Sequence, residues 1–170
     1  MTVTEKRSWF EVLYRSLFDD VYAYFSLCFH ASAAEELAQN VFENVWAAVG
    51  KWDFTPPDSE RAWVFRIAVN VKNDALRAKY RQPQTAELSE TDQPHAGGLD
   101  APEISVLVRD AFTRLTDADR ELLVLKNAGL DSKELSMLLG VTPSAVRTRL
   151  SAARGRFRTI LVKCGVNPDE

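Results

Sequence analysis

Large apolar residues almost disappear from the sequence between residues 82 and 103. The segment QPQTAELSETDQPHAGGLDAPE has only Leu88 and Leu99 of this kind, together with three prolines, two glycines, five acidic residues and no Lys or Arg. Such a stretch buries too little surface to offset the entropy lost on ordering. We therefore predict a flexible linker at 82–103 between one domain at 1–81 and another at 104–170. A long ordered loop inside a single domain is the alternative.

Apolar residues on both sides of this segment recur with the period of an α-helix. Two stripes precede it, Phe10, Leu13, Tyr14, Leu17, Phe18, Val21, Tyr22 and Phe25, and then Ala34, Leu37, Ala38, Val41, Phe42, Val45, Trp46 and Val49. Gly50 is placed to end the second helix, and Asp58 or Ser59 to begin a third at 60–81 after the TPP loop. No segment shows the sustained two-residue alternation of a strand. The predicted fold class is all-α, with two small helical domains joined by the linker.

One side of the third predicted helix carries basic and amide side chains, at Arg66, Asn70, Arg77 and Arg81. Aromatic residues lie around the proline loop next to this stripe, at Trp52, Phe54, Trp63 and Phe65. Aromatic rings beside cations suit single-stranded nucleic acid, where bases stack and phosphates need countercharge. A solvated polar face, with most of the aromatic residues in the core, is the alternative.

The second predicted helix carries acids and amides opposite its apolar stripe. They are Glu35, Glu36, Gln39, Asn40 and Glu43. This surface repels phosphate and is more typical of a protein-docking face. The alternative is the ordinary polar side of an amphipathic helix.

The second half of the chain has the pattern of a helix-turn-helix. Capping residues and stop residues alternate along it, with Thr116, Asp131 and Thr142 as N-caps, Gly129 and Gly140 as stops, and Pro143 at a first helical position. Two helices joined by a short turn that contains glycine form the arrangement found in many DNA-binding proteins.

The last predicted helix has a basic outer face. Its buried stripe is expected to be Val146, Leu150, Ala153, Phe157, Ile160 and Leu161, which leaves Ser144, Arg147, Thr148, Ser151, Arg154 and Arg158 outside. No acidic residue occurs from 135 to 168, although the whole chain has a formal net charge of −3. Such a face suits the major groove of DNA. A basic amphipathic helix on an anionic membrane or a calmodulin-like partner is the alternative.

Composition and spacing exclude several other classes. Cys28 and Cys164 are far apart, and His30 and His95 do not complete a metal site with them. The start, MTVTEKRSWFEV, has charges where a signal peptide needs an apolar core, and no apolar run reaches the length of a bilayer span. We find no catalytic motif. We expect a cytoplasmic protein without membrane insertion, cofactor, metal or enzyme activity.

In these helical patterns and polar faces, the chain resembles a bacterial sigma factor of the extracytoplasmic-function (ECF) group of the sigma-70 family. The similarity covers residues 9–81 and 104–163. AEELAQNVFENVWAAVGKWD is similar to region 2.2, RAWVFRIAVNVKNDALRAKYR to regions 2.3 and 2.4, and LTDADRELLVLKNAGLDSKELSMLLGVTPSAVRTRLSAAR to region 4. The helix-turn-helix is common among regulators, so both halves in this order and at this spacing carry the resemblance.

The resemblance implies three sets of functional residues. Core RNA polymerase would bind, through the clamp helices of its largest subunit, to Glu36, Gln39, Asn40 and Phe42. The minus-ten element and an unstacked base of its non-template strand would contact Trp52, Phe54, Arg61, Trp63, Arg66, Asn70 and Arg77. The minus-thirty-five duplex would contact Arg120, Ser144, Arg147, Thr148, Ser151 and Arg154. Relatives usually have an acid in place of Asn40, and often a large or basic residue in place of Ser151 and Ala152, so we expect those contacts to differ here.

The function implied by the resemblance is promoter-specific transcription initiation as an alternative sigma factor. Its expected partners are core RNA polymerase, promoter DNA both as duplex and as non-template single strand, and an anti-sigma factor. The alternatives are a stand-alone helix-turn-helix regulator, a sigma mimic that binds an anti-sigma factor, and a nucleic-acid-modifying enzyme.

Overall fold

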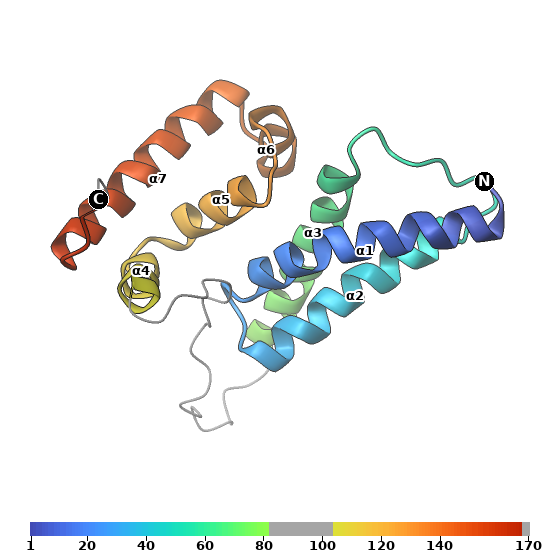
Figure 1. Cartoon of the computed structure of the whole chain (residues 1–170), viewed down its shortest axis with the longest axis horizontal. Coiled ribbons are helices and arrows are strands. Elements are labelled where there is room, and N and C mark those ends of the chain that lie inside the picture. Colours follow the sequence, from blue (N-terminus) through green and yellow to red (C-terminus); the bar gives the residue numbers. More distant parts are fainter. Residues whose placement is uncertain (82–103, 168–170) are drawn as a thin grey trace. The chain divides into compact units, whose positions relative to one another are not determined.

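The computed structural model describes residues 1–81 and 104–167, in which the secondary structure consists of seven α-helices (Figure 1). The predicted all-α fold class is confirmed. The described residues form two compact units, the N-terminal unit (residues 1–81) and the C-terminal unit (residues 104–167). The linker predicted at 82–103 lies outside the described residues. Within the described ranges, every helix is too short or too polar to cross a bilayer.

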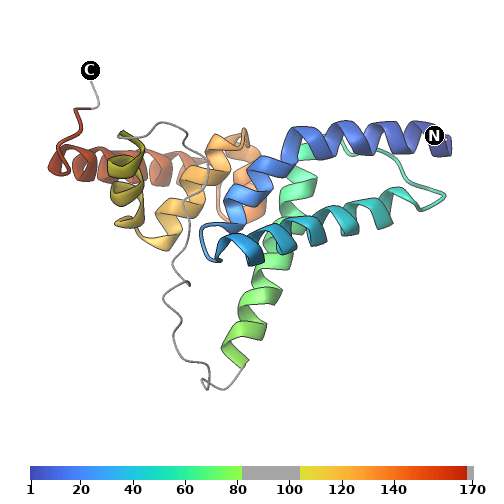
Figure 2. The same cartoon turned by 60° about the horizontal axis from the view of Figure 1, so that its bottom comes forward.

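Two long helices lie side by side in the N-terminal unit, α1 (Val3–Phe25) and α2 (Ala31–Val49) (Figures 1 and 2). They pack because the two predicted apolar stripes face each other. The core residues that they contribute are Leu13, Leu17, Val21, Tyr24, Phe25, Ala34, Ala38, Val41, Phe42, Val45 and Val49. Thr2 and Glu5 close the start of α1 with a capping box. The cap of α2 was not predicted and is His30, whose Nδ1 accepts a hydrogen bond from the Ala33 N–H at 3.3 Å.

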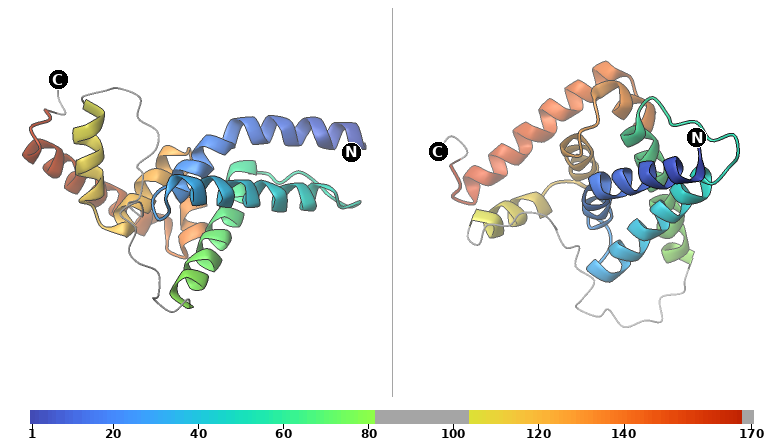
Figure 3. Two further views of the ribbon diagram at one scale, coloured as in Figure 1. Left: turned by 90° about the horizontal axis from the view of Figure 1, so that it is seen from below. Right: turned by 45° about the vertical axis from the view of Figure 1, so that its right-hand side comes forward.

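The third helix, α3 (Glu60–Arg81), crosses the α1–α2 pair, and its last turns extend beyond it (Figures 2 and 3). Of the two predicted capping residues, Ser59 caps the helix, since its hydroxyl accepts from the Ala62 N–H at 3.3 Å. Val64, Phe65 and Ala68 are fully buried, and Phe65 packs edge-on against Tyr24 of α1. The loop at 50–59 is therefore held between the end of α2 and the start of α3.

The C-terminal unit contains α4 (Ile104–Thr113), α5 (Asp117–Asn127), α6 (Ser132–Leu139) and α7 (Pro143–Lys163). All three predicted N-caps are confirmed, because the side chains of Thr116, Asp131 and Thr142 each accept a hydrogen bond from the backbone three residues on. Gly140 ends α6 with a φ of 67°, a left-handed conformation that favours glycine. α4, α5 and α6 each contact α7 (Figure 3).

Leucine and alanine dominate the core of the C-terminal unit, with Leu122, Leu125, Leu130 and Leu135 buried from α5, α6 and their connection. The predicted buried stripe of α7 is correct at Val146, Leu150, Ala153 and Leu161. Phe157 and Ile160 are instead only half-buried. Phe157 packs edge-on against Phe112 of α4, with the ring centroids 5.9 Å apart.

Candidate nucleic-acid and protein interfaces

The predicted minus-ten aromatic residues divide into exposed and packed ones. Trp52 is 93% exposed on the loop that precedes α3. Phe54 and Trp63 are half-buried, and their ring centroids are 6.1 Å apart. Only Trp52 of these three therefore offers a free ring face to a base.

The predicted basic residues of α3 also differ in their surroundings. Arg66 and Asn70 are exposed, on the side of the helix away from buried Phe65 and Ala68. Arg77 is exposed and forms an ion pair with Asp74 at 3.2 Å. A pair that is open to solvent on both sides can exchange its partner for a phosphate at small cost.

Arg61 at the start of α3 and Tyr80 at its end add detail to the predicted minus-ten surface. Arg61 forms an ion pair with Asp20 of α1 at 3.2 Å, and both side chains are about one-third exposed. This contact holds the start of α3 against α1. Tyr80, which is not among the residues predicted from sequence, is 84% exposed one turn after Arg77, so it adds an aromatic ring to the basic end of α3. An exposed tyrosine within a basic stretch is the signal that was available for it.

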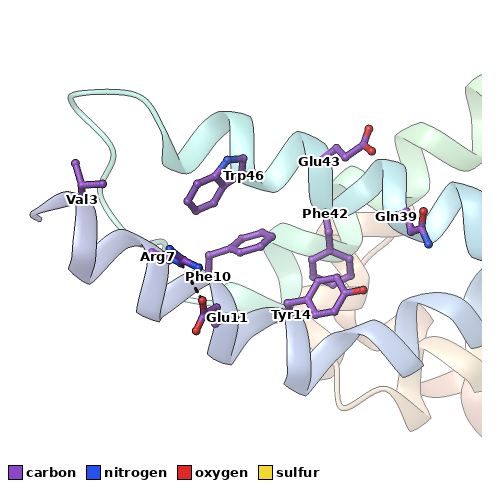
Figure 4. A pocket seen from close by; sticks show the side chains of 9 residues that line it. All are labelled: Val3, Arg7, Phe10, Glu11, Tyr14, Gln39, Phe42, Glu43 and Trp46. Atoms are coloured by element: carbon purple, nitrogen blue, oxygen red, sulfur yellow. Dashed lines mark hydrogen bonds and ion pairs between the residues drawn. The ribbon is translucent and has the colours of Figure 1, made fainter.

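The predicted polymerase-binding residues lie on and beside one groove. Glu36, Gln39 and Asn40 are exposed on α2, whereas Phe42 is buried at 2% exposure. Phe42 nevertheless lines the groove between α1 and α2, which has a volume of about 690 Å³ (Figure 4). The residues that line it are Val3, Arg7, Phe10, Glu11, Tyr14, Gln39, Phe42, Glu43 and Trp46.

Aromatic rings from both helices form the floor of this α1–α2 groove. The ring centroids of Phe10 and Trp46 are 4.9 Å apart, as are those of Tyr14 and Phe42 (Figure 4). Trp46 belongs to the apolar stripe predicted for its helix, but 45% of it is exposed. The contribution of α1 was not predicted, because the period of a single helix does not show which second helix completes a groove. The rim is polar and carries Gln39, Glu43 and an ion pair between Arg7 and Glu11, whose atoms are 3.1 Å apart.

Five of the six residues predicted to contact the minus-thirty-five element lie on the outer face of α7. Ser144, Arg147, Thr148, Ser151 and Arg154 are all exposed. They lie opposite Val146, Leu150 and Ala153, which are at most 4% exposed. Along this face Ser144 comes first, two residues after the N-cap Thr142, and short polar side chains then alternate with the two arginines.

Arg120 differs from the other predicted DNA-binding residues because its side chain is only 16% exposed. It lies in the first turn of α5, and its guanidinium pairs with Asp117. Its Nε is buried without a hydrogen-bond partner among the described residues. A phosphate contact would therefore have to involve the terminal nitrogens.

A second arginine, which was not predicted from sequence, joins α7 to α5. Arg156 donates two hydrogen bonds to the Asp119 carboxylate, from Nε at 2.6 Å and from the terminal Nη2 at 2.8 Å. These bonds lower the pKa of Asp119 and raise that of Arg156. The pair ties the helix that carries the outer face to the start of α5. Two charges 37 residues apart give no local signal in the sequence.

Comparison with known proteins identifies the family. The family model for Sigma-70 region 2 matches residues 13–82, and the model for Sigma-70, region 4 matches residues 105–157. The chain is 33% identical over 135 residues to the ECF RNA polymerase sigma factor ShbA of Streptomyces griseus, covering 74% of this chain and 70% of that protein. It is 34% identical over 134 residues to the ECF RNA polymerase sigma factor RpoE of Cereibacter sphaeroides, covering 75% and 72%.

Solved structures support the same fold. The sigma factor RpoE of Bartonella quintana, solved with the anti-sigma factor NepR, aligns with a TM-score of 0.66 at 20% identity, covering 94% of this chain and 98% of that one. CnrH, solved with the cytosolic domain of CnrY, aligns with a TM-score of 0.61 at 22% identity, covering 92% and 89%.

A helical unit with an aromatic groove, and a second with a helix-turn-helix whose outer face is basic, are features typical of a DNA-binding transcription factor that also binds protein. The chain belongs to the sigma-70 family and, within it, to the ECF group of RNA polymerase sigma factors. Sigma factors bind core RNA polymerase and promoter DNA and direct initiation at promoters. The chain is accordingly a transcription initiation factor and not an enzyme.

Proposed function

We propose that the two units divide the work of initiation between them. The N-terminal unit binds core polymerase and captures the non-template strand of the minus-ten element, the C-terminal unit reads the minus-thirty-five duplex, and residues 82–103 connect them. The contrast between their outward faces carries this proposal. One unit exposes acids, amides and aromatic rings, whereas the outer face of α7 is polar and basic.

The minus-thirty-five element is read by α7 in the major groove. Arg147 and Arg154 can each donate two hydrogen bonds to a guanine edge or contact a phosphate, and a good bidentate pair is worth about 1–3 kcal/mol of discrimination. Ser144, Thr148 and Ser151 are short enough to let the helix approach the bases closely. Ser151 in place of a larger side chain favours a different minus-thirty-five sequence from that of relatives.

The minus-ten element is opened by trapping a base rather than by any bond-breaking step. Removing a base from the stack costs a few kcal/mol, which stacking on an aromatic ring and contact with a basic stripe can offset. Trp52 supplies the exposed ring, and Arg66, Asn70 and Arg77 supply donors along α3. Phe54, Trp63 and Arg61 act by holding the loop and the start of α3, because each already has packing or ionic contacts within the unit.

Core polymerase binds to the exposed side of α2 and to the α1–α2 groove. Glu36, Gln39 and Asn40 offer acceptors to basic and amide groups of the partner, while the aromatic floor accepts an apolar side chain. Phe42 contributes from the floor of the groove. Glu43 on the rim and the exposed Glu36 of the same helix favour a partner helix that combines an apolar anchor with basic residues.

We further propose that an anti-sigma factor regulates this protein in the cytoplasm. Both solved neighbours described above were determined as complexes, and NepR, the partner in one of them, is an anti-sigma factor. Exposed aromatic residues such as Trp46 and Trp52 would gain from being covered when polymerase is absent. The cytoplasm is also where core polymerase and the chromosome are found.

Co-elution with core RNA polymerase on size exclusion tests the division of labour. We expect a stoichiometric complex that the double substitution Gln39→Ala and Asn40→Ala weakens. The double substitution Arg147→Ala and Arg154→Ala should leave that complex intact and lower the affinity of the holoenzyme for promoter duplex. Equal damage to polymerase binding by both pairs would contradict the proposal. If folded protein formed no complex, duplex binding by the chain alone would indicate a stand-alone regulator, and no duplex binding a sigma mimic.

A further inference from the structure

One tryptophan of α1 connects the loop at 50–59 to the start of α3. The Trp9 ring centroid lies 5.3 Å from that of Phe54 in the loop and 6.3 Å from that of Trp63 in the first turn of α3. Its indole Nε1 also donates a hydrogen bond of 2.6 Å to the carboxylate of Glu60, the first residue of α3. A single side chain therefore contacts the middle of the loop and the start of α3, both on the C-terminal side of the candidate base-stacking residue Trp52.

A second contact from α1 holds the other side of the loop. Lys6, one turn before Trp9, donates from its ammonium group to the backbone carbonyl of Lys51. The Phe54 N–H in turn donates to the same Lys51 carbonyl at 3.2 Å. Residues 51 and 54 are thus tied down on either side of Trp52, which is 93% exposed.

This arrangement lies beside the core and not within it. The first buried residue of α1 is Leu13, one turn after Trp9, and Trp9 itself is half-buried. Its ring contacts are with the loop and the first turn of α3. Loss of the Glu60 hydrogen bond would therefore loosen Trp9 against the loop and the start of α3 without opening the core.

We propose that Trp9 is a positioning residue for capture of the non-template base, acting through Trp52. The inference rests on the proposed function of Trp52. Binding a base to a mobile loop would cost the entropy of ordering that loop, whereas a loop that is already anchored presents its ring without this cost. Trp9 stays packed inside the anchor and does not touch the DNA.

Fluorescence of 2-aminopurine measures the unstacking of the non-template base, the step that the proposed role of Trp9 affects. The probe is a promoter selected from a random duplex pool by transcription with the wild-type holoenzyme, with 2-aminopurine at successive non-template positions of the minus-ten region. The variants are Trp9→Ala, Trp52→Ala and their combination, each assembled with core polymerase. Val12→Ala is the matched control, because Val12 is 69% exposed on the same helix.

We expect Trp9→Ala to slow unstacking about tenfold, which is within the range of affinity that one stacked base contributes. Polymerase binding by this variant, and unstacking by the Val12→Ala control, should stay at wild-type values. In the Trp52→Ala background, adding Trp9→Ala should slow it by less than about twofold, since a positioning residue acts through the residue it positions. Equal losses in both backgrounds, or a wild-type rate for Trp9→Ala, would overturn the inference. A wild-type rate for Trp52→Ala would remove the proposed role of Trp52, and this inference with it.

A second pair of variants keeps the test decisive if Trp9→Ala fails to fold. Trp9→Phe retains a ring but loses the N–H donor, and Glu60→Ala removes the acceptor. Each should slow unstacking, and the double variant should be no slower than either single variant, because both remove the same hydrogen bond. Wild-type unstacking by both single variants, or fully additive losses, would show that this bond does not position the loop.

Discussion

The two units of this sigma factor expose different chemistry because they are built differently. The N-terminal unit joins three long helices through aromatic contacts, and Tyr24, Phe25 and Phe65 are its largest fully buried side chains. The C-terminal unit packs α4, α5 and α6, of 8 to 11 residues each, against the 21-residue α7, and leucines make up much of its core. The N-terminal unit is rich in aromatic residues, and some of them, such as Trp52 and Trp46, lie on its surface. A unit whose buried core is aliphatic leaves the outer face of α7 for polar residues.

This difference suits two kinds of partner. An unstacked base and an apolar anchor of a protein both bind to aromatic surface, whereas a DNA duplex presents phosphates and polar base edges. The division also gives an experimental handle. All four tryptophans, at positions 9, 46, 52 and 63, belong to the N-terminal unit. Tryptophan fluorescence therefore reports the unfolding of that unit, while circular dichroism at 222 nm reports both.

The largest expected effect comes from a cavity in the C-terminal unit. Leu135 is fully buried in α6, so Leu135→Ala should lower the stability of that unit by about 3 kcal/mol. Urea titrations are followed by both signals. We expect the part of the dichroism signal that comes from the C-terminal unit to be lost at lower urea, while the fluorescence midpoint stays at its wild-type value. The mirror variant Val45→Ala should move the fluorescence midpoint. A shift of both signals with Leu135→Ala would mean that the two units unfold together.

The next effect separates the two exposed tryptophans of the N-terminal unit. Trp52→Ala should weaken binding of the holoenzyme to non-template single strand by about 1–3 kcal/mol, the contribution of one stacked base, and leave polymerase binding unchanged. Trp46→Ala should do the reverse, since Trp46 lines the α1–α2 groove. Fluorescence anisotropy with labelled oligonucleotide and with labelled sigma factor measures the two affinities. The same loss in both assays for either variant would contradict the separation.

A smaller effect compares two capping boxes of the same kind. Asp131 and Glu134 cap α6 inside the helix-turn-helix, whereas Thr2 and Glu5 cap the free end of α1. Asp131→Ala should lower the stability of the C-terminal unit by about 1 kcal/mol. Thr2→Ala should have a smaller effect on the N-terminal unit, because only an exposed end of α1 frays. Urea midpoints by dichroism and fluorescence give the two losses of stability. Equal losses for Asp131→Ala and Thr2→Ala would show that the cap of α6 matters no more to its unit than the cap of α1 does to the N-terminal unit.

The smallest expected effect is a pH dependence confined to the C-terminal unit. The hydrogen bonds from Arg156 hold the pKa of Asp119 below its ordinary value, so the pair stabilises the fold above that value. This contribution is lost as the pH falls through the lowered pKa of the folded state. Between about pH 5 and pH 2, wild-type protein should therefore lose stability that Asp119→Asn does not. Dichroism melting curves across this range test it, and parallel profiles for the two proteins would contradict it.

Local features of the chain were predictable because their causes lie within a few residues. A helix start depends on a side chain that reaches the backbone three residues on, which is why Thr116, Asp131 and Thr142 could be assigned from sequence. The exposed residues of α7 followed from the helical period, since one face had to be buried. Phe157 and Ile160 were predicted to be more buried than they are, because the period does not show how far neighbouring helices extend along α7.

The sequence by itself determined the all-α class, the starts of α5, α6 and α7 and the polar faces of α2 and α7, through capping and periodicity. Only the tertiary structure decided which side chains from distant segments meet. Trp9 with Phe54 and Glu60, Phe10 with Trp46, and Asp119 with Arg156 are such pairs. Their contacts depend on how whole helices pack, and packing is set by the shape of the complete core, which no short stretch of sequence contains.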